Sequence, residues 1–202
     1  MWSCANCHHL EVTEEKPEQC PVCGAGSDKF QVHTVPDVKG AKTLENLQVS
    51  LAAESKAHER NLAFALKAEQ ENLPEIAKLF RAVAEAEAIH AYRDLNLLGA
   101  VSETQENLEV AFERENHAGN SYPRFIKEAN KEGDTNVAKV FSQTRDVERE
   151  HAKLYEKALE HMLGDAGAEY YVCRVCGYVA DGSVPENCPI CGAPGKNFRH
   201  VE

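Results

Sequence analysis

Two short motifs place ionisable residues within apolar, helix-like stretches. Glu87 and His90 lie three residues apart in EAEAIHAY. Glu148 and His151 have the same spacing in VEREHAKLY. Residues three apart lie on one face of a helix, so the two side chains of each pair project together. A single pair of this kind is usually a solvated surface pair, but a buried carboxylate needs a counter-charge such as a metal ion.

The two motifs belong to an internal repeat, in which residues 54–91 align onto residues 115–152 without a gap. The identical positions include Glu54/Glu115, Glu87/Glu148 and His90/His151. A helical pattern would align apolar positions by chance, but it would not align Glu and His. Each half is therefore predicted to be one helical hairpin, with a Glu on its first helix and Glu-x-x-His on its second.

Two such hairpins placed face to face would gather four carboxylates and two imidazoles. Desolvation and mutual repulsion would oppose this cluster unless two metal cations occupied it. The composition is that of the di-iron and di-manganese carboxylate sites of ferritin-like bundles. Ligation by several oxygens and one nitrogen per metal suits iron or manganese better than structural zinc. The predicted ligands are Glu54, Glu87, His90, Glu115, Glu148 and His151.

The eight cysteines form one cluster of two CxxC pairs near each end of the sequence. The N-terminal cluster is Cys4, Cys7, Cys20 and Cys23, and the C-terminal cluster is Cys173, Cys176, Cys188 and Cys191. The two segments resemble each other, since each contains CPxCGA and a Phe seven residues after the last Cys. This spacing, in a chain without a visible secretory signal, favours tetrahedral metal sites over the alternative of disulfides.

Apolar periodicity predicts four helices of roughly 25 to 30 residues in the middle of the chain. Breaks are expected at Asn72–Pro74, near Gly99–Ser102 and at Gly133–Asp134, and Ser102 with Gln105 resembles a capping box for the third helix. The expected domains are an N-terminal Cys4 domain (1–35), a linker (36–42), a four-helix domain (43–164) and a C-terminal Cys4 domain (165–202). The predicted fold class is mainly α, a ferritin-like bundle flanked by two small metal domains.

Charge and hydropathy narrow the range of partners. The net charge is -11, which argues against nucleic acid and anionic membranes as main partners. No apolar stretch approaches the roughly 18 to 20 residues that span a bilayer. The first ten residues contain CxxC instead of a charged start followed by an apolar run. The protein is therefore expected to be cytoplasmic.

Taken together, the paired Glu and Glu-x-x-His motifs and the CRVCGYV and CPICGAP segments resemble the rubrerythrin family over nearly the whole chain. The resemblance implies a di-iron site held by the six predicted ligands, with Glu87 and Glu148 as bridges. It also implies one iron in the C-terminal Cys4 site. Common members have one rubredoxin-like domain, whereas this chain has the pattern at both ends, and the N-terminal site is expected to hold iron or zinc.

The sequence departs from the usual family pattern at three places. Ala118 stands where a further carboxylate is usual, which makes the expected site more symmetric. Asn61 replaces an iron-proximal Tyr, and only its repeat mate Tyr122 remains, seven residues after Glu115 on the ligand face. Tyr122 is predicted to hydrogen-bond a ligand or peroxide, with core packing as the alternative. His8 replaces the Gly that normally follows CxxC, which weakens the case for iron at the N-terminal site.

The short break between the second and third helices limits how the hairpins assemble. A helix of 25 residues is about 38 Å long. The break near residues 98–103 spans at most about 20 Å. It cannot cross the bundle, so the alternatives are an up-down-up-down bundle or a homodimer with swapped hairpins. The swapped dimer is the prediction.

The resemblance implies reduction of hydrogen peroxide to water in defence against oxidative stress, with electrons arriving through a rubredoxin-like iron. A reductase that uses NAD(P)H, or a rubredoxin, is the expected donor. The first alternative is a ferroxidase or dioxygen-reducing protein, which Ala118 favours. The second is a non-catalytic redox sensor or a zinc-ribbon interaction protein.

Overall fold

The computed structural model describes residues 2–7, 9–11, 13, 15–33, 38–160 and 168–202. These residues form four long helices and two small three-stranded sheets, which confirms the predicted mainly α class with a cysteine cluster at each end. One compact unit contains the first sheet with helices α1 and α2, and a second contains α3, α4 and the second sheet. Within the described ranges, no helix has the length and apolarity needed to cross a membrane.

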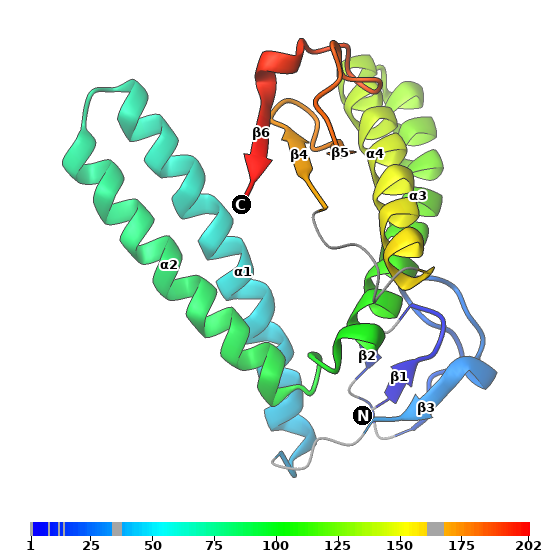
Figure 1. Cartoon of the computed structure of the whole chain (residues 1–202). Helices are drawn as coiled ribbons and strands as arrows, with labels where there is room; N and C mark the ends of the chain where they lie inside the picture. Colours follow the sequence, from blue (N-terminus) through cyan, green and yellow to red (C-terminus); the bar gives the residue numbers. More distant parts are fainter. Residues whose placement is uncertain (1, 8, 12, 14, 34–37, 161–167) are drawn as a thin grey trace. The chain divides into compact units, whose positions relative to one another are not determined.

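The helices form two hairpins with the same turn (Figure 1). Helix α1 (Ala41–Gln70) is followed by α2 (Pro74–Leu97), and α3 (Thr104–Glu132) is followed by α4 (Thr135–Glu160). Asn72 (φ 58°) and Gly133 (φ 86°) occupy equivalent repeat positions, and both adopt the left-handed conformation that commonly ends a helix. Pro74 is the first residue of α2. A backbone N–H at this position has no hydrogen-bond partner within the helix, so proline is tolerated there although it lacks one. The shared turn supports the internal duplication.

Small and aromatic side chains are repeated at equivalent places in the two helix pairs. Ala68 and Ala77 are buried in the first hairpin, and their repeat mates Ala129 and Ala138 are buried in the second. In the first hairpin the rings of Phe64 and Phe80 pack with centroids 5.5 Å apart, and the corresponding Phe125 and Phe141 lie 5.9 Å apart. Buried alanines let paired helices approach closely, and each aromatic pair joins the two helices of its own hairpin.

The third helix begins one residue later than the predicted capping box places it. Helix α3 begins at Thr104, and its N-cap is Glu103, in extended conformation and without a side-chain hydrogen bond to the helix. Ser102 therefore lies one residue before the N-cap, and Gln105 is the second residue of the helix.

The two Cys4 domains share one topology. In the N-terminal domain, β1 (Trp2–Cys4) lies between β2 (Leu10–Glu11) and β3 (Phe30–Val32), and all pairings are antiparallel. In the C-terminal domain, β4 (Tyr170–Cys173) lies in the same way between β5 (Val179–Asp181) and β6 (Phe198–Val201). A short 3-10 turn precedes the last strand in each, at Ser27–Lys29 and Gly195–Asn197.

Among the described glycines of the C-terminal domain, Gly195 is the one where an added Cβ would collide with the backbone. A Cβ there would lie 2.6 Å from the Pro185 carbonyl oxygen and 3.1 Å from Cγ1 of Val184. We expect Gly195→Ala to lower the free energy of unfolding of the metal-loaded domain by about 1–3 kcal/mol, as overpacking does elsewhere. The matched control is Ser27→Ala, because Ser27 already carries a Cβ at the equivalent N-terminal position. Thermal unfolding of both metal-loaded variants measures this, and an unchanged melting temperature for Gly195→Ala would contradict the close approach.

Candidate metal centres

Helices α1 and α2 bring together one predicted group of ligands. Atoms of Glu54, Glu87 and His90 that could ligate a metal all lie within 4.8 Å of one another. The Nδ1 atom of His90 is 2.9 Å from Oε2 of Glu87 and 3.7 Å from Oε2 of Glu54. The histidine therefore points one ring nitrogen at both carboxylates, as a shared metal ion would require.

Helices α3 and α4 repeat the arrangement. Glu115, Glu148 and His151 form the corresponding group, again with ligating atoms within 4.8 Å. The Nδ1 atom of His151 is 3.2 Å from Oε2 of Glu148 and 3.9 Å from Oε1 of Glu115. Each hairpin thus presents two carboxylates and one imidazole, which we call a half-site.

The carboxylates of each half-site repel one another. Burial, together with the hydrogen bond and the charge of Glu148, raises the pKa of Glu115 to about 8. In the other half-site, the hydrogen bond with Glu87 raises the pKa of Glu54. Two carboxyl groups this close share a proton because both cannot ionise together without a counter-charge. A divalent or trivalent cation removes that obstacle, so the donor set fits iron.

A second nitrogen of His151 contacts the C-terminal Cys4 domain. Its Nε2 atom is 3.1 Å from the carbonyl oxygen of Gly177, the residue that directly follows Cys176. Metal-binding histidines typically donate their other ring N–H to a carbonyl or carboxylate, which fixes the tautomer and the ring orientation. His151 already has this arrangement. Its side chain is 22% exposed, whereas that of His90 is 53% exposed.

Gly177 fits this contact because its φ of 86° is one that side chains rarely adopt. It packs beside Val147 on α4, where a Cβ would lie 3.9 Å from Cγ1, an ordinary van der Waals distance. In the N-terminal domain the equivalent position is His8, which lies outside the described residues, so the expectation based on His8 remains a prediction.

Tyr122 and its repeat mate Asn61 differ as the sequence predicted. Burial, and then the charges of Glu148 and Glu115, raise the pKa of Tyr122, so its hydroxyl lies near the half-site and stays protonated. Its ring also packs on Phe125 and Phe141, with centroids 5.6 Å and 5.9 Å away. Core packing of the ring is therefore present, and a hydrogen bond from the hydroxyl to a ligand or to peroxide stays a prediction. The Asn61 amide instead donates to the carbonyl of Ala57 in its own helix.

Sequence reasoning missed Tyr155. Burial, and then the charge of Glu115, raise the pKa of this tyrosine. It also lines a cavity of about 330 Å³ that reaches His151 and is bounded by apolar side chains such as Leu108 and Val179. A signal was available, because Tyr155 follows His151 by four residues and so lies on the same helix face.

The sulfur atoms of the cysteine clusters have the spacing of a tetrahedral metal site. Cys4 and Cys23 have sulfurs 3.7 Å apart, Cys173 and Cys191 are at 3.8 Å, and Cys176 and Cys188 are at 3.6 Å. A tetrahedron with metal–sulfur bonds of about 2.3 Å separates its sulfurs by about 3.8 Å. A disulfide would need about 2.05 Å. The clusters therefore fit the predicted metal sites.

Backbone N–H groups tune the C-terminal cluster. Burial opposes ionisation of the Cys173 thiol, but hydrogen bonds from the N–H groups of Val175 and Cys176 outweigh it and lower the pKa of Cys173. Burial raises the pKa of Cys176. N–H donors directed at sulfur stabilise thiolate and are among the factors that set the potential of iron–sulfur sites.

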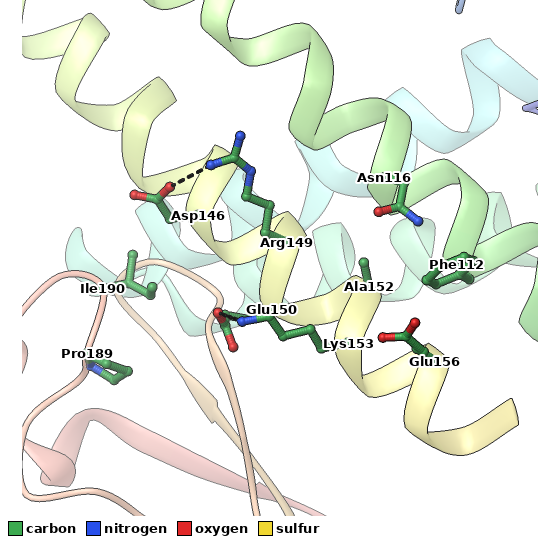
Figure 2. Close-up of a pocket in the computed structure, with 10 residues that line it drawn as sticks. All are labelled: Phe112, Asn116, Asp146, Arg149, Glu150, Ala152, Lys153, Glu156, Pro189 and Ile190. Carbon is green, nitrogen blue, oxygen red and sulfur yellow. Dashed lines mark hydrogen bonds and ion pairs between the residues drawn. The ribbon is translucent and has the colours of Figure 1, made fainter. Parts of the chain in front are cut away.

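A larger pocket of about 600 Å³ lies on another face of α4 (Figure 2). Pro189 and Ile190, which separate Cys188 from Cys191, face the α4 residues Asp146 and Arg149 across it. Ion pairs join Arg149 to Asp146 at 3.9 Å and Lys153 to Glu150 at 2.7 Å. The pocket contains none of the predicted metal ligands, but it shows that the second CxxC loop lies beside α4.

Comparison with known proteins found family models that match the middle and both ends of the chain. A family model described as rubrerythrin matches residues 45–106 and 106–180. A second model, the rubredoxin-like domain of rubrerythrin, matches residues 2–31 and 171–199, so both ends carry that domain.

Individual relatives extend over most of the chain. Nigerythrin from Nitratidesulfovibrio vulgaris is 33% identical over 192 residues, covering 81% of this chain and 90% of that protein. Rubrerythrin from Porphyromonas gingivalis is 34% identical over 185 residues, covering 82% and 92%. A solved structure of partially reduced nigerythrin is 30% identical, covers 84% of this chain and 91% of that chain, and has a TM-score of 0.49. On the family models and the sequence relatives, the chain belongs to the rubrerythrin family.

Proposed function

We propose that the protein is a non-haem di-iron peroxidase that reduces hydrogen peroxide to water with electrons delivered through the C-terminal Cys4 iron. The observation that carries the proposal is the contact of His151 with the carbonyl of Gly177. It joins a half-site to the residue after Cys176 through one hydrogen bond, which is a short route for an electron. The contact places the cysteine-held iron beside the half-site, which supports electron delivery to that half-site.

The chemistry divides between the metals and the chain. Two ferrous ions supply the two electrons that, with two protons, convert hydrogen peroxide to two molecules of water. The carboxylates of the two half-sites, Glu54 and Glu87 with Glu115 and Glu148, balance the positive charge. Tyr122 holds a protonated hydroxyl near Glu115 and Glu148, where it can donate a hydrogen bond to a ligand or to peroxide. The external electron donor is a rubredoxin or a reductase that uses NAD(P)H.

A complete site needs the two half-sites to face each other. On α2, the exposed side chains of Ile76, Leu79 and Val83 continue the row of Glu87 and His90 at spacings of three and four residues. The repeat mates Val137 and Val140 are exposed on α4 in the same way. Exposed apolar side chains next to metal ligands form a helix face that packing against a second hairpin would cover.

We further propose that the facing hairpin comes from a second copy of the chain. Helix α2 has 24 residues and is about 36 Å long. The connection from residue 98 to residue 103 reaches at most about 20 Å. It is too short to let α2 and α3 run parallel in one bundle, as ferritin-like folds require. Sedimentation of the iron-loaded protein should give a dimer, and a stable iron-loaded monomer would exclude the swapped arrangement.

A dioxygen-reducing or ferroxidase activity is the second candidate, and Ala118 favours it. Ala118 on α3 provides no oxygen ligand three residues after Glu115, so each half-site has the same three donors. A metal held by Glu115, Glu148 and His151 would therefore have no additional carboxylate at position 118 to take up during turnover.

One experiment separates the two candidates. Anaerobically reduced, iron-loaded protein is mixed in parallel with stoichiometric peroxide and with dioxygen, and the visible absorption of the ferric Cys4 sites is followed. We expect fast oxidation by peroxide and slow oxidation by dioxygen. The reverse order would replace the peroxidase proposal with the oxidase one, and colourless Cys4 sites would support a non-catalytic, zinc-binding role.

A further inference from the structure

The C-terminal Cys4 domain contacts α4 at more than one point. Gly177 lies against Val147 and His151, and Pro189 and Ile190 face Asp146 and Arg149 (Figure 2). Further along the helix, Nζ of Lys157 lies 2.6 Å from Oδ2 of Asp181, at the end of β5. From Val147 to Lys157 the helix rises about 15 Å. The domain thus lies along α4 and is not attached at a single point.

The Lys157–Asp181 pair can limit movement of the C-terminal domain on α4 in a way that the Gly177 contact alone cannot. Gly177, Pro189 and Ile190 all face the part of α4 between Asp146 and His151, so the domain could still rock about that end. The Lys157–Asp181 pair lies six residues beyond His151 on the helix and opposes this motion. The pair is a charge-assisted hydrogen bond, with side chains 50% and 27% exposed. It contains no predicted metal ligand, so it can be altered without changing either metal site.

We infer that Lys157 and Asp181 are positioning residues that hold the C-terminal Cys4 domain on α4, with Gly177 against His151, and thereby set the rate at which electrons leave the cysteine-held iron. The role of the pair in electron delivery rests on the proposed peroxidase function, whereas its role in docking does not. Electron transfer depends on this contact because the hydrogen bond from His151 exists only while the domain is docked.

Charge reversal tests the inference. Partly exposed ion pairs are weak, so Lys157→Ala should slow oxidation of the C-terminal Cys4 iron only about two- to five-fold. Lys157→Glu places two carboxylates together and should slow it by more than about five-fold. The double variant Lys157→Glu/Asp181→Lys restores the pair with reversed polarity and should recover most of the rate. The matched control is Lys139→Glu, which makes the same charge change at an exposed position of α4.

The rates are followed by stopped flow after reduced, iron-loaded protein is mixed with peroxide. All variants are compared in the full protein, and a parallel Cys4→Ser/Cys7→Ser sample identifies the part of the visible absorption that comes from the C-terminal site. The rate at which peroxide oxidises the di-iron pair should be the same in all variants. A variant that had lost its structure would not keep this rate.

Docking is measured separately on protein loaded with zinc, which is redox-silent. NMR relaxation of the C-terminal amides should show faster tumbling in Lys157→Glu and recovery in the double variant. Unchanged tumbling and unchanged rates in Lys157→Glu would overturn the inference. If the parent protein fails to react with peroxide, the peroxidase proposal fails, while the tumbling comparison still decides whether the pair docks the domain.

Discussion

Replacement of Glu115 by alanine should lower peroxide turnover by more than about 100-fold, because even the outer partners of metal ligands contribute 10- to 100-fold to metal affinity or activity. Glu115 is the only carboxylate that α3 contributes to the half-site it forms with Glu148 and His151. Its loss leaves that half-site with one carboxylate and one imidazole. Metal analysis should find less than two iron atoms per di-iron site, with the cysteine-held metals retained.

The matched control is Glu128→Ala on the same helix. The Glu128 side chain is 60% exposed and lies 4.0 Å from Arg124, away from both half-sites. It should bind iron and reduce peroxide as the parent does. A Glu115→Ala protein that keeps its full iron content and activity would remove this residue from the ligand set.

Replacement of Cys176 by serine should leave a single oxidation by peroxide intact but strongly reduce sustained turnover. The change removes one thiolate from the C-terminal Cys4 site, the proposed electron carrier, whose residue Gly177 contacts His151. Pre-reduced protein should still react once with peroxide at the di-iron site. Multiple turnover with reduced rubredoxin as donor should fall by at least about 100-fold, since electrons no longer have a carrier beside the site.

The equivalent Cys7→Ser variant measures the part played by the N-terminal domain. Cys7 occupies the same place in the N-terminal cluster as Cys176 does in the other. We expect a smaller loss of turnover than in Cys176→Ser. Equal losses would show that both domains carry electrons in series, and a larger loss in Cys7→Ser would make the N-terminal site the principal donor.

Much of this architecture could be predicted from the sequence because its signals are local. Helix periodicity alone places Glu87 beside His90 and Glu148 beside His151, and the structure finds each pair in contact. The CxxC spacing likewise brings four sulfurs together without information on the rest of the chain. The family models at both ends and the two half-sites confirm the predicted set of a di-iron site and two rubredoxin-like Cys4 sites.

Contacts between distant segments could not be predicted in this way. Nothing in the local sequence of Lys157 or Asp181 indicates that they pair, because the contact depends on how a separate domain lies on α4. The same holds for Gly177, whose partner His151 is 26 residues away in the sequence. The start of α3 was missed for a different reason: Ser102 is a good N-cap residue by type, but the backbone places Glu103 there instead.

The shared turn at Asn72 and Gly133 also has an evolutionary consequence. A chain with one hairpin must pair with a copy of itself to hold two metals, and every substitution then appears on both sides of the site. Once two hairpins are encoded in one gene, a substitution changes only one side. The repeat positions Asn61 and Tyr122 hold different residues, and His151 is less exposed than its repeat mate His90, so the two half-sites show differences of that kind. Duplication thus allows the two half-sites to diverge, and the half-site of His151 has acquired a contact with the C-terminal Cys4 domain.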